Sequence, residues 1–364
     1  MCATACVRAL ELRIDRVPSG KAKAKPNDPM QVPFGTVFTD HMFIMEYSDG
    51  QWHDARIQPY GPLMLDPAAL VLHYGQGIFE GMKAYRRGKR VFLFRPEMNL
   101  ERLNRSAARM VMPTVDVSFV LSALKSLLRI ERDWIPDVAG ASLYIRPTMI
   151  ASEARLGVKA AQQYLLYVIL SPVGPYFKEG FSPIKVLVSD KYVRAARGGT
   201  GSAKTMGNYA MGLLAGKEAS DSGHSQVLWL DAIERKYLEE AGTMNVFAVI
   251  DGEVLTPPLK DTILPGVTRD SVIELARQWG YTVHERELSI DEVISGVHAN
   301  RVQELFGTGT AAVIAPIGMF TYKSKSYTVG EGKAGPLSRR LFEELMGLQC
   351  GERRDTHGWI VEVE

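Results

Sequence analysis

A glycine-rich stretch followed by a lysine is the part of the sequence best suited to chemistry. Residues 198–205 read Gly-Gly-Thr-Gly-Ser-Ala-Lys-Thr, which places Lys204 directly after a flexible loop. The string resembles a phosphate-binding P-loop, but Ala203 stands where that motif needs a glycine to wrap the backbone around phosphates. The apolar run 227–231 ends in Asp231, which could supply the magnesium-binding aspartate of such a site. A nucleotide hydrolase is therefore one open interpretation.

Lys204 can alternatively be the amine that forms a Schiff base with pyridoxal phosphate. Such a lysine needs a tight loop, a phenol, a buried carboxylate and separate phosphate donors. Tyr209 can supply the phenol, and Glu240 can supply the carboxylate. The turn at 264–268 leads into a helix, and the free N–H groups and positive dipole end of a helix attract anions. Each required group can thus be named in this sequence.

Six short strings follow one another in the order found in a known enzyme family. They are residues 38–42, 72–74, 79–84, 143–147, 240–245 and 264–269. In these strings the chain resembles the branched-chain amino acid aminotransferases, which are pyridoxal-phosphate enzymes of fold type IV. The resemblance extends from about residue 34 to residue 316. It implies an α+β fold with two mixed α/β domains and the cofactor in the cleft between them.

The resemblance gives Lys204 a covalent role. It implies that Lys204 holds pyridoxal phosphate as a Schiff base and, once displaced by the substrate amine, moves the proton from the substrate α-carbon to the cofactor. Glu240 is expected to keep the pyridine nitrogen protonated, and Tyr209 to hydrogen-bond the phenolate oxygen. Met206 stands where many relatives have a glycine, a departure that concerns the path of the loop.

The phosphate group is expected to meet three segments of the chain. The resemblance implies that the backbone amides of Val267 and Thr268 bind it at a helix start, together with the side chains of Arg102 and Thr310. Without the resemblance, Arg102 would be interpreted as a charge on the outer face of its helix.

The substrate site is likewise implied by the family. Backbone amides of the turn at Thr310, Ala311 and Ala312 are expected to meet the substrate carboxylate, because small residues allow close approach. The expected side-chain pocket consists of Phe34, Tyr74, Tyr144, Tyr176 and Thr243, with Val158 contributed by the partner subunit.

Arg146 is expected to bind the distal carboxylate of glutamate. Alternate residues of a strand share a face, so Tyr144 and Arg146 can line one wall of the pocket. With an aliphatic substrate, the Tyr144 hydroxyl and the guanidinium would satisfy each other or a neighbour; with glutamate, the guanidinium would turn to the carboxylate. The alternative is that Arg146 pairs with a structural carboxylate.

These assignments predict a transaminase that moves the amino group between leucine, isoleucine or valine and 2-oxoglutarate. Two enzymes of the same fold stay open, namely a D-amino acid aminotransferase and an aminodeoxychorismate lyase, which uses the same lysine for elimination. A nucleotide hydrolase and a non-enzymatic binding protein are more remote. The resemblance also implies a homodimer, and we expect no metal ion in the site.

Composition and charge narrow the range of partners. Of 364 residues, 46% are hydrophobic and 23% charged, and 43 basic against 41 acidic residues leave a formal net charge of +2. This balance offers no strong field for nucleic acid or an anionic membrane, and the apolar runs are too short to span a bilayer. Cys2, Cys6 and Cys350 form no disulfide framework, which favours a reducing, cytoplasmic location. Small-molecule substrates and a second copy of the chain are the expected partners.

The elements that position these residues are expected in two halves. The first half is expected to contain strands at 43–47, 71–74, 91–94, 143–146 and 164–170 and helices at 98–112 and 118–133. The second is expected to contain strands at 185–188, 227–230, 245–250 and 302–306 and helices at 209–220, 268–279 and 336–346. The resulting division is a polar tail (1–30), a smaller domain (31–171), a connection rich in turn formers (172–183) and a larger domain with Lys204 (184–364).

Overall fold

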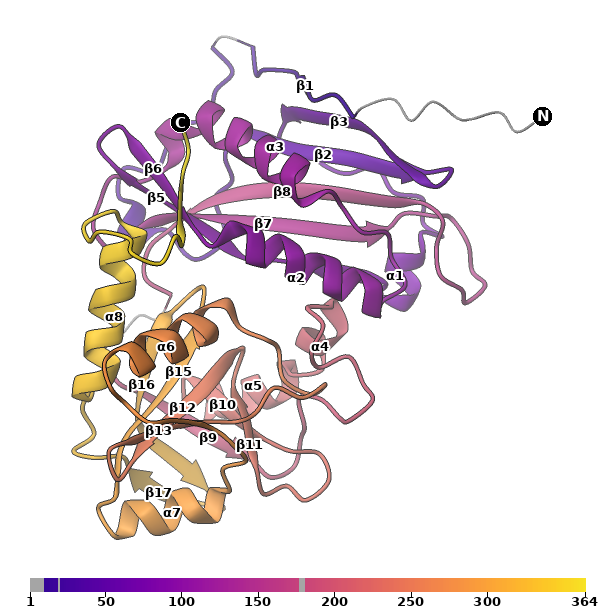
Figure 1. The fold of residues 1–364 in the computed structure, drawn as a ribbon. Helices are drawn as coiled ribbons and strands as arrows, with labels where there is room; N and C mark the ends of the chain where they lie inside the picture. The colour runs from indigo at the N-terminus through magenta and orange to yellow at the C-terminus, as the bar shows by residue number, and fades with distance from the viewer. Residues whose placement is uncertain (1–9, 19, 177–180) are drawn as a thin grey trace.

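The computed structural model describes residues 10–18, 20–176 and 181–364. Two sheets, each covered by helices, form two domains that lie one above the other in Figure 1. This arrangement confirms the expected α+β fold of two mixed domains.

The first domain is built on a mainly antiparallel sheet. Its strands are, in spatial order, β1 (Arg13–Ile14), β3 (Gln51–Pro59), β2 (His41–Ser48), β8 (Tyr164–Val173), β7 (Ser142–Ala151), β5 (Met82–Arg87), β6 (Arg90–Phe94) and β18 (Ile360–Glu362), with β4 (Gly77–Phe79) paired to β7. β1 runs parallel to β3, whereas the other pairs are antiparallel.

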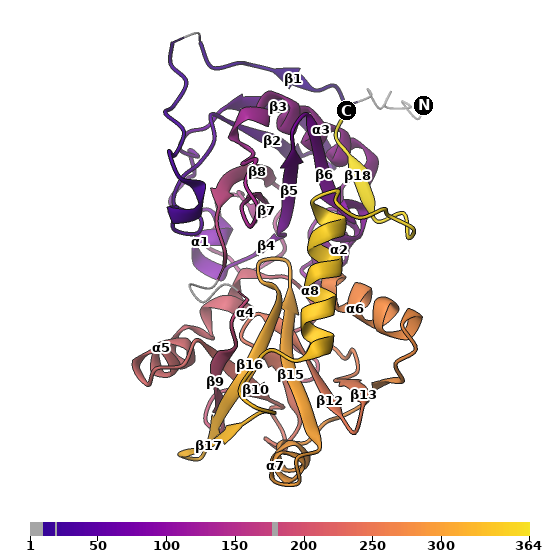
Figure 2. The same cartoon turned by 90° about the vertical axis from the view of Figure 1, so that its left-hand side faces the viewer.

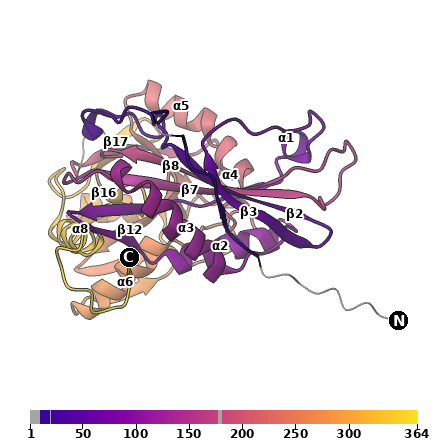
Figure 3. The same ribbon diagram turned by 90° about the horizontal axis from the view of Figure 1, so that it is seen from above.

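Two helices cover one face of this sheet. They are α2 (Pro96–Arg109) and α3 (Val117–Ile130), which pack side by side (Figure 3). Proline at the first position of α2 suits a helix start, and the Asp116 carboxylate caps α3 by accepting the Phe119 amide at 3.0 Å. Leu100, Leu103, Leu124 and Leu127 of these helices enter the core of the domain.

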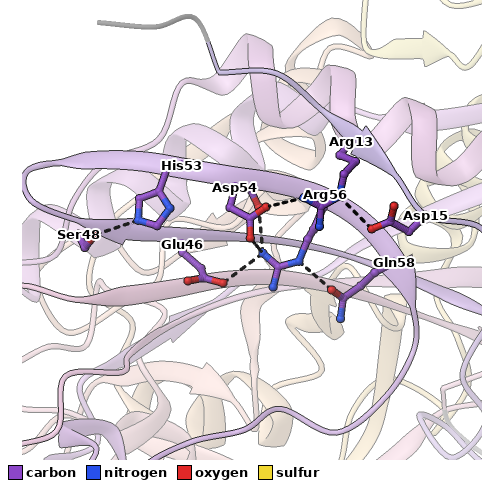
Figure 4. A network of polar contacts seen from close by, with 8 residues as sticks. All are labelled: Arg13, Asp15, Glu46, Ser48, His53, Asp54, Arg56 and Gln58. Atoms are coloured by element: carbon purple, nitrogen blue, oxygen red, sulfur yellow. Dashed lines mark hydrogen bonds and ion pairs between the residues drawn. The ribbon is translucent and has the colours of Figure 1, made fainter.

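The N-terminal segment is attached to the sheet rather than being only a polar tail. Arg13 and Ile14 form β1, which pairs with Arg56 and Ile57 of β3. Ion pairs at or near the surface lie close to this pairing, where Arg13 donates to Asp54 at 3.1 Å and Arg56 of β3 donates to Glu46 of β2 at 3.1 Å (Figure 4). Such exposed pairs stabilise little. The backbone pairing of β1 therefore accounts for the attachment, and so short a strand leaves no periodic signal.

The second domain contains a sheet that closes on itself. Its strands are, in order, β11 (Leu238–Ala241), β10 (Gln226–Leu230), β9 (Ile184–Ser189), β16 (Val313–Tyr322), β15 (Val302–Gly309), β12 (Met244–Ile250), β13 (Glu253–Thr256) and β14 (Val283–Glu285), with β17 (Lys325–Thr328) on β16. Pairing of β11 with β12 closes the ring. The helices that follow in this half of the chain are α4 (Met206–Ala210), α5 (Leu213–Asp221), α6 (Val267–Gln278), α7 (Ile290–His298) and α8 (Pro336–Gln349).

The C-terminal segment returns to the first domain. Helix α8 packs on β15 and β16 and reaches β6, and Figure 2 shows it upright beside both domains. Beyond it, β18 pairs with β6. The expected assignment of all residues 184–364 to one domain is therefore wrong for β18, whose three residues provide no pattern that reveals their partner.

Other differences concern short elements. Residues 71–74, expected as a strand, belong to helix α1 (Leu70–Tyr74), which ends at Gly75 with a φ of 62°. The expected helix 209–220 is divided into α4 and α5. Strand β8 continues to Val173, inside the expected connection 172–183, part of which (177–180) lies outside the described residues. Two short 3-10 helices are η1 (Pro29–Gln31) and η2 (Arg132–Trp134).

Candidate active site

A cavity of about 560 Å³ is lined by residues of both domains. Most of the residues predicted from the sequence line it: Phe34, Arg102, Tyr144, Arg146, Tyr176, Lys204, Tyr209, Thr243, Val267, Thr268, Thr310, Ala311 and Ala312. Glu240 lies directly behind this lining, whereas Tyr74 and Val158 do not line it. The volume is typical of sites for small organic ligands.

Lys204 is held in the cavity by its own loop and by the first domain. Its backbone amide donates to Ser106 Oγ at 2.9 Å, and its carbonyl accepts the Phe79 amide at 3.0 Å. The side-chain Nζ donates to the Tyr209 hydroxyl at 2.7 Å. A Cβ on Gly201 would lie 2.6 Å from the backbone of Thr262, so the loop path requires glycine there.

Glu240 lies behind the cavity, and each of its carboxylate oxygens has a polar partner. Its Oε2 is 2.6 Å from Arg194 Nε, and its Oε1 accepts the Leu264 amide at 2.9 Å. Burial raises the pKa of Glu240, and the guanidinium of Arg194 opposes that rise. Asn245 donates to both Glu240 and the Leu264 carbonyl, which connects the carboxylate with the 264–268 turn.

Arg102 is a buried cation, not a charge on an outer helix face. Its Nε and Nη2 donate to the two carboxylate oxygens of Glu80 at 2.8 and 2.9 Å, and Nη1 donates to the Pro265 carbonyl at 3.0 Å. Burial alone would raise the pKa of Glu80, but Arg102 holds it below its ordinary value. The two-point geometry fixes the guanidinium at the edge of the cavity.

An anion-binding cradle lies next to Arg102. Helix α6 begins at Val267, and the N–H groups of its first turn have no partner within the helix. Val267 and Thr268 line the cavity at this end, as does Thr308. Among the described residues, the buried Thr308 Oγ1 has no hydrogen-bond partner. Free amides, a hydroxyl and a guanidinium thus converge where a phosphate could bind.

Aromatic rings and one arginine form the opposite wall. The Phe34 ring lies edge-on to Tyr144 and Tyr176, with centroids 4.9 and 5.4 Å away. Arg146 Nη2 donates to the Tyr144 hydroxyl at 3.0 Å, and its guanidinium lies over the Phe79 ring. Within the described chain, no carboxylate pairs with Arg146, and its buried Nε has no hydrogen-bond partner. The arginine is therefore available to a ligand.

The turn between β15 and β16 closes the cavity from the second domain. Gly309 and Val313 pair across it, so Thr310, Ala311 and Ala312 form the connection. Val313 has a φ of 61°, which is rare for a β-branched residue. Strained backbone of this kind is concentrated at ligand sites.

Tyr74, expected in the substrate pocket, does not line the cavity of this chain. Tyr74 ends helix α1, is 45% exposed, and donates its hydroxyl to the carbonyl of Leu156. Tyr74 thus ends a helix where a strand was expected over 71–74. Val158, expected to act on a partner subunit, is 81% exposed.

The P-loop interpretation of residues 198–205 is wrong. The carboxylate of Asp231 accepts the backbone amides of Ile233, Glu234, Lys236 and Tyr237, so it organises a turn. It does not line the cavity that contains Lys204. Arg194 is a site-supporting residue that the sequence did not reveal. Asn245 and Glu80 lie in recognised strings, but their supporting roles were not predicted.

In the described part of the chain, no helix is long and apolar enough to cross a membrane. The family described as amino-transferase class IV matches residues 77–319. A Bacillus subtilis protein named branched-chain-amino-acid aminotransferase 2 is 52% identical over 343 residues, which cover 94% of each chain. Fold, site and matches together define an aminotransferase, and the chain belongs to the class IV aminotransferase family.

Solved structures agree with this family. The crystal structure of the Escherichia coli branched-chain amino acid aminotransferase is 30% identical, with a TM-score of 0.76, and the match covers 89% of this chain and 99% of the other. A T.th. enzyme of the same name, complexed with N-(5'-phosphopyridoxyl)-L-glutamate, is 28% identical with a TM-score of 0.71, covering 88% and 98%.

Proposed function

We propose that the protein is a branched-chain amino acid transaminase that uses pyridoxal phosphate. It transfers the amino group reversibly between leucine, isoleucine or valine and 2-oxoglutarate. The observation that carries this proposal is the Lys204 amine, 2.7 Å from the Tyr209 hydroxyl, in a cavity that also presents the start of α6. The names of the relatives support branched-chain substrates over D-amino acids or a lyase reaction.

The residues present fit pyridoxal phosphate. The free amides of Val267 and Thr268, the Thr308 hydroxyl and the Arg102 guanidinium would hold the phosphate, and Thr310 lines the same end. Glu240 would face the ring nitrogen.

The chain's own residues perform the binding and proton steps. When bound, pyridoxal phosphate supplies an electron-accepting ring that stabilises negative charge at the substrate α-carbon. The Lys204 amine would take the proton from the substrate α-carbon and deliver it to the cofactor. The Tyr209 hydroxyl holds that amine in place. The amides of the 310–312 turn would bind the substrate carboxylate, with Thr243 beside them.

The aromatic wall and Arg146 together would accept both aliphatic substrates and glutamate. Phe34, Tyr144 and Tyr176 present apolar ring faces to an aliphatic side chain. For glutamate, Arg146 would exchange its hydrogen bond with Tyr144 for a charge-assisted pair with the distal carboxylate.

The proposed function is tested with Lys204→Ala. We expect this variant to lose leucine transamination, because no other lysine among the described residues lines the cavity, while the far-ultraviolet circular dichroism is unchanged. Lys217→Ala, at an exposed position of α5, is the control and should keep wild-type activity. Borohydride reduction of the wild-type holoenzyme should attach the cofactor to Lys204. Attachment to a different lysine, or full activity of Lys204→Ala, would refute the assignment.

We also infer a homodimer located in the cytoplasm. Exposed apolar side chains support an interface: Leu72, Leu156, Val158 and Leu213 are all more than half exposed. In the dimer, Val158 would act on the partner's site. Cys350 is a free thiol, in accordance with a reducing compartment. Light scattering of the purified holoenzyme tests the dimer, and a monomeric mass would refute it.

A further inference from the structure

Lys83 extends from the first domain to the substrate-facing turn of the second. It lies on β5 and pairs in register with Tyr144 of β7. Its Nζ donates to the carbonyl oxygen of Ala311 at 2.6 Å. One charged hydrogen bond therefore connects the first sheet with the turn formed by Thr310, Ala311 and Ala312.

The ammonium group reaches this turn from outside the large cavity. Lys83 is absent from the lining of that cavity, but it lines a separate space of about 20 Å³. Thr310, Val267 and Thr268 line both spaces, so they separate the two. Lys83 is thus placed behind the turn.

A cation at a peptide oxygen acts on the other end of the same peptide. The Ala311 carbonyl shares a rigid plane with the N–H of Ala312, so holding the oxygen fixes the direction of that N–H. The charge also polarises the peptide and strengthens its N–H as a donor. The turn ends at Val313, whose φ of 61° is unfavourable and persists only where surrounding contacts maintain it.

We propose that Lys83 is a positioning residue for substrate carboxylates. It holds the 310–312 turn so that the Ala312 amide is directed at the carboxylate of the amino acid or 2-oxo acid. This inference rests on the proposed function, which assigns that carboxylate to this turn.

The charge state of Lys83 supports the role. Burial lowers the pKa of Lys83 to about 8, so the Lys83 amine is protonated in most molecules at neutral pH. The nearby Cys350 thiol, whose pKa burial raises to about 11, is then uncharged. The positive charge behind the turn is therefore not cancelled by this neighbour.

The test compares Lys83→Met and Lys83→Arg in the holoenzyme. Lys83→Met should raise the KM for leucine and the inhibition constant of 4-methylpentanoate by about tenfold, the order expected when a hydrogen bond to a charged group is lost. The change in kcat should be smaller, and Lys83→Arg should restore most of the affinity. Lys89→Met, at an exposed position between β5 and β6, is the matched control.

The neutral ligand 4-methylpentanamide separates positioning from general structural damage. Its affinity should change much less than that of the acid, because it lacks the negative charge. Equal losses for acid and amide, or an unchanged inhibition constant of the acid, would overturn the proposal. If Lys83→Met does not fold, Lys83→Gln is measured in the same way, with the same decisive outcomes. Failure of the proposed function is a different result, because wild-type enzyme would then not transaminate leucine.

Discussion

Arg194 connects the Lys204 loop with the carboxylate of Glu240. Arg194 Nε lies 2.6 Å from Glu240 Oε2, and the two residues are 6% and 2% exposed. The same guanidinium donates to the carbonyls of Gly201 and Thr262. The alignment of lysine and carboxylate therefore depends on a residue that does not itself line the cavity.

Arg194→Met should leave Glu240 as a buried carboxylate without its cation. Burial already raises the pKa of Glu240, and loss of Arg194 should raise it further. A carboxyl with a raised pKa in the folded state favours folding when protonated, so the variant should lose stability as pH rises through that pKa. We expect a loss of about 3–5 kcal/mol at pH 8 and less at pH 5, measured by denaturant unfolding. A loss that does not depend on pH would contradict this account.

Arg146→Gln should separate the two half-reactions. The guanidinium contacts Tyr144 and Phe79 and is free to pair with a ligand carboxylate. We expect kcat/KM for glutamate and 2-oxoglutarate to fall by ~10- to 100-fold, which corresponds to a charged hydrogen bond of ~1.5–3 kcal/mol. The value for leucine should fall much less. Equal losses for both substrates, measured in single half-reactions, would show that Arg146 has only a structural role.

Residues close in sequence could be placed in the site from the sequence. Lys204 and Tyr209 lie on one loop and the following helix, and their side chains meet. The alternation of Tyr144 and Arg146 on β7 likewise predicted that the two share a wall. Short spacing in the sequence brings each pair together, although the family resemblance, and not the spacing, selected Tyr209.

The residues that support the site from behind its lining could not be predicted. Arg194 acquires its role because three distant segments meet at its guanidinium, and no local pattern marks such a residue. The strand expected at 71–74 is a helix, because so short an apolar string fits either element. Short strands such as β1 and β18 are defined only by their partners.

Glu304→Gln should destabilise the helix that spans both domains. Helix α8 has no side-chain cap of its own, and the buried Glu304 of β15 accepts the amides of Leu337 and Ser338 at 2.7 and 2.8 Å. An amide has one acceptor oxygen and no charge to interact with the helix dipole, so we expect a loss of about 1–3 kcal/mol. The melting temperature checks this, with the exposed Glu343→Gln as control. Similar melting temperatures for both variants would contradict the capping role.

Carboxylate affinity should fall as pH rises through about 8, because Lys83 then loses its proton. The pKa of Lys83 is lowered to about 8 by burial. Burial raises the pKa of the neighbouring Cys350 thiol to about 11 and also raises the pKa of Tyr85, so neither group loses a proton in this range. The other charged groups that face Cys350 are Arg87 and Glu352.

The ligand 4-methylpentanoate is suited to this measurement, because its carboxyl group is ionised throughout and it has no amine. Its inhibition constant should increase between pH 7 and 9 in the wild-type holoenzyme. In Lys83→Arg the increase should be smaller, since a guanidinium keeps its charge over this range. The difference between the two profiles separates the effect of Lys83 from that of every group that the two proteins share. Superimposable profiles would mean that the charge of Lys83 does not act on the bound carboxylate.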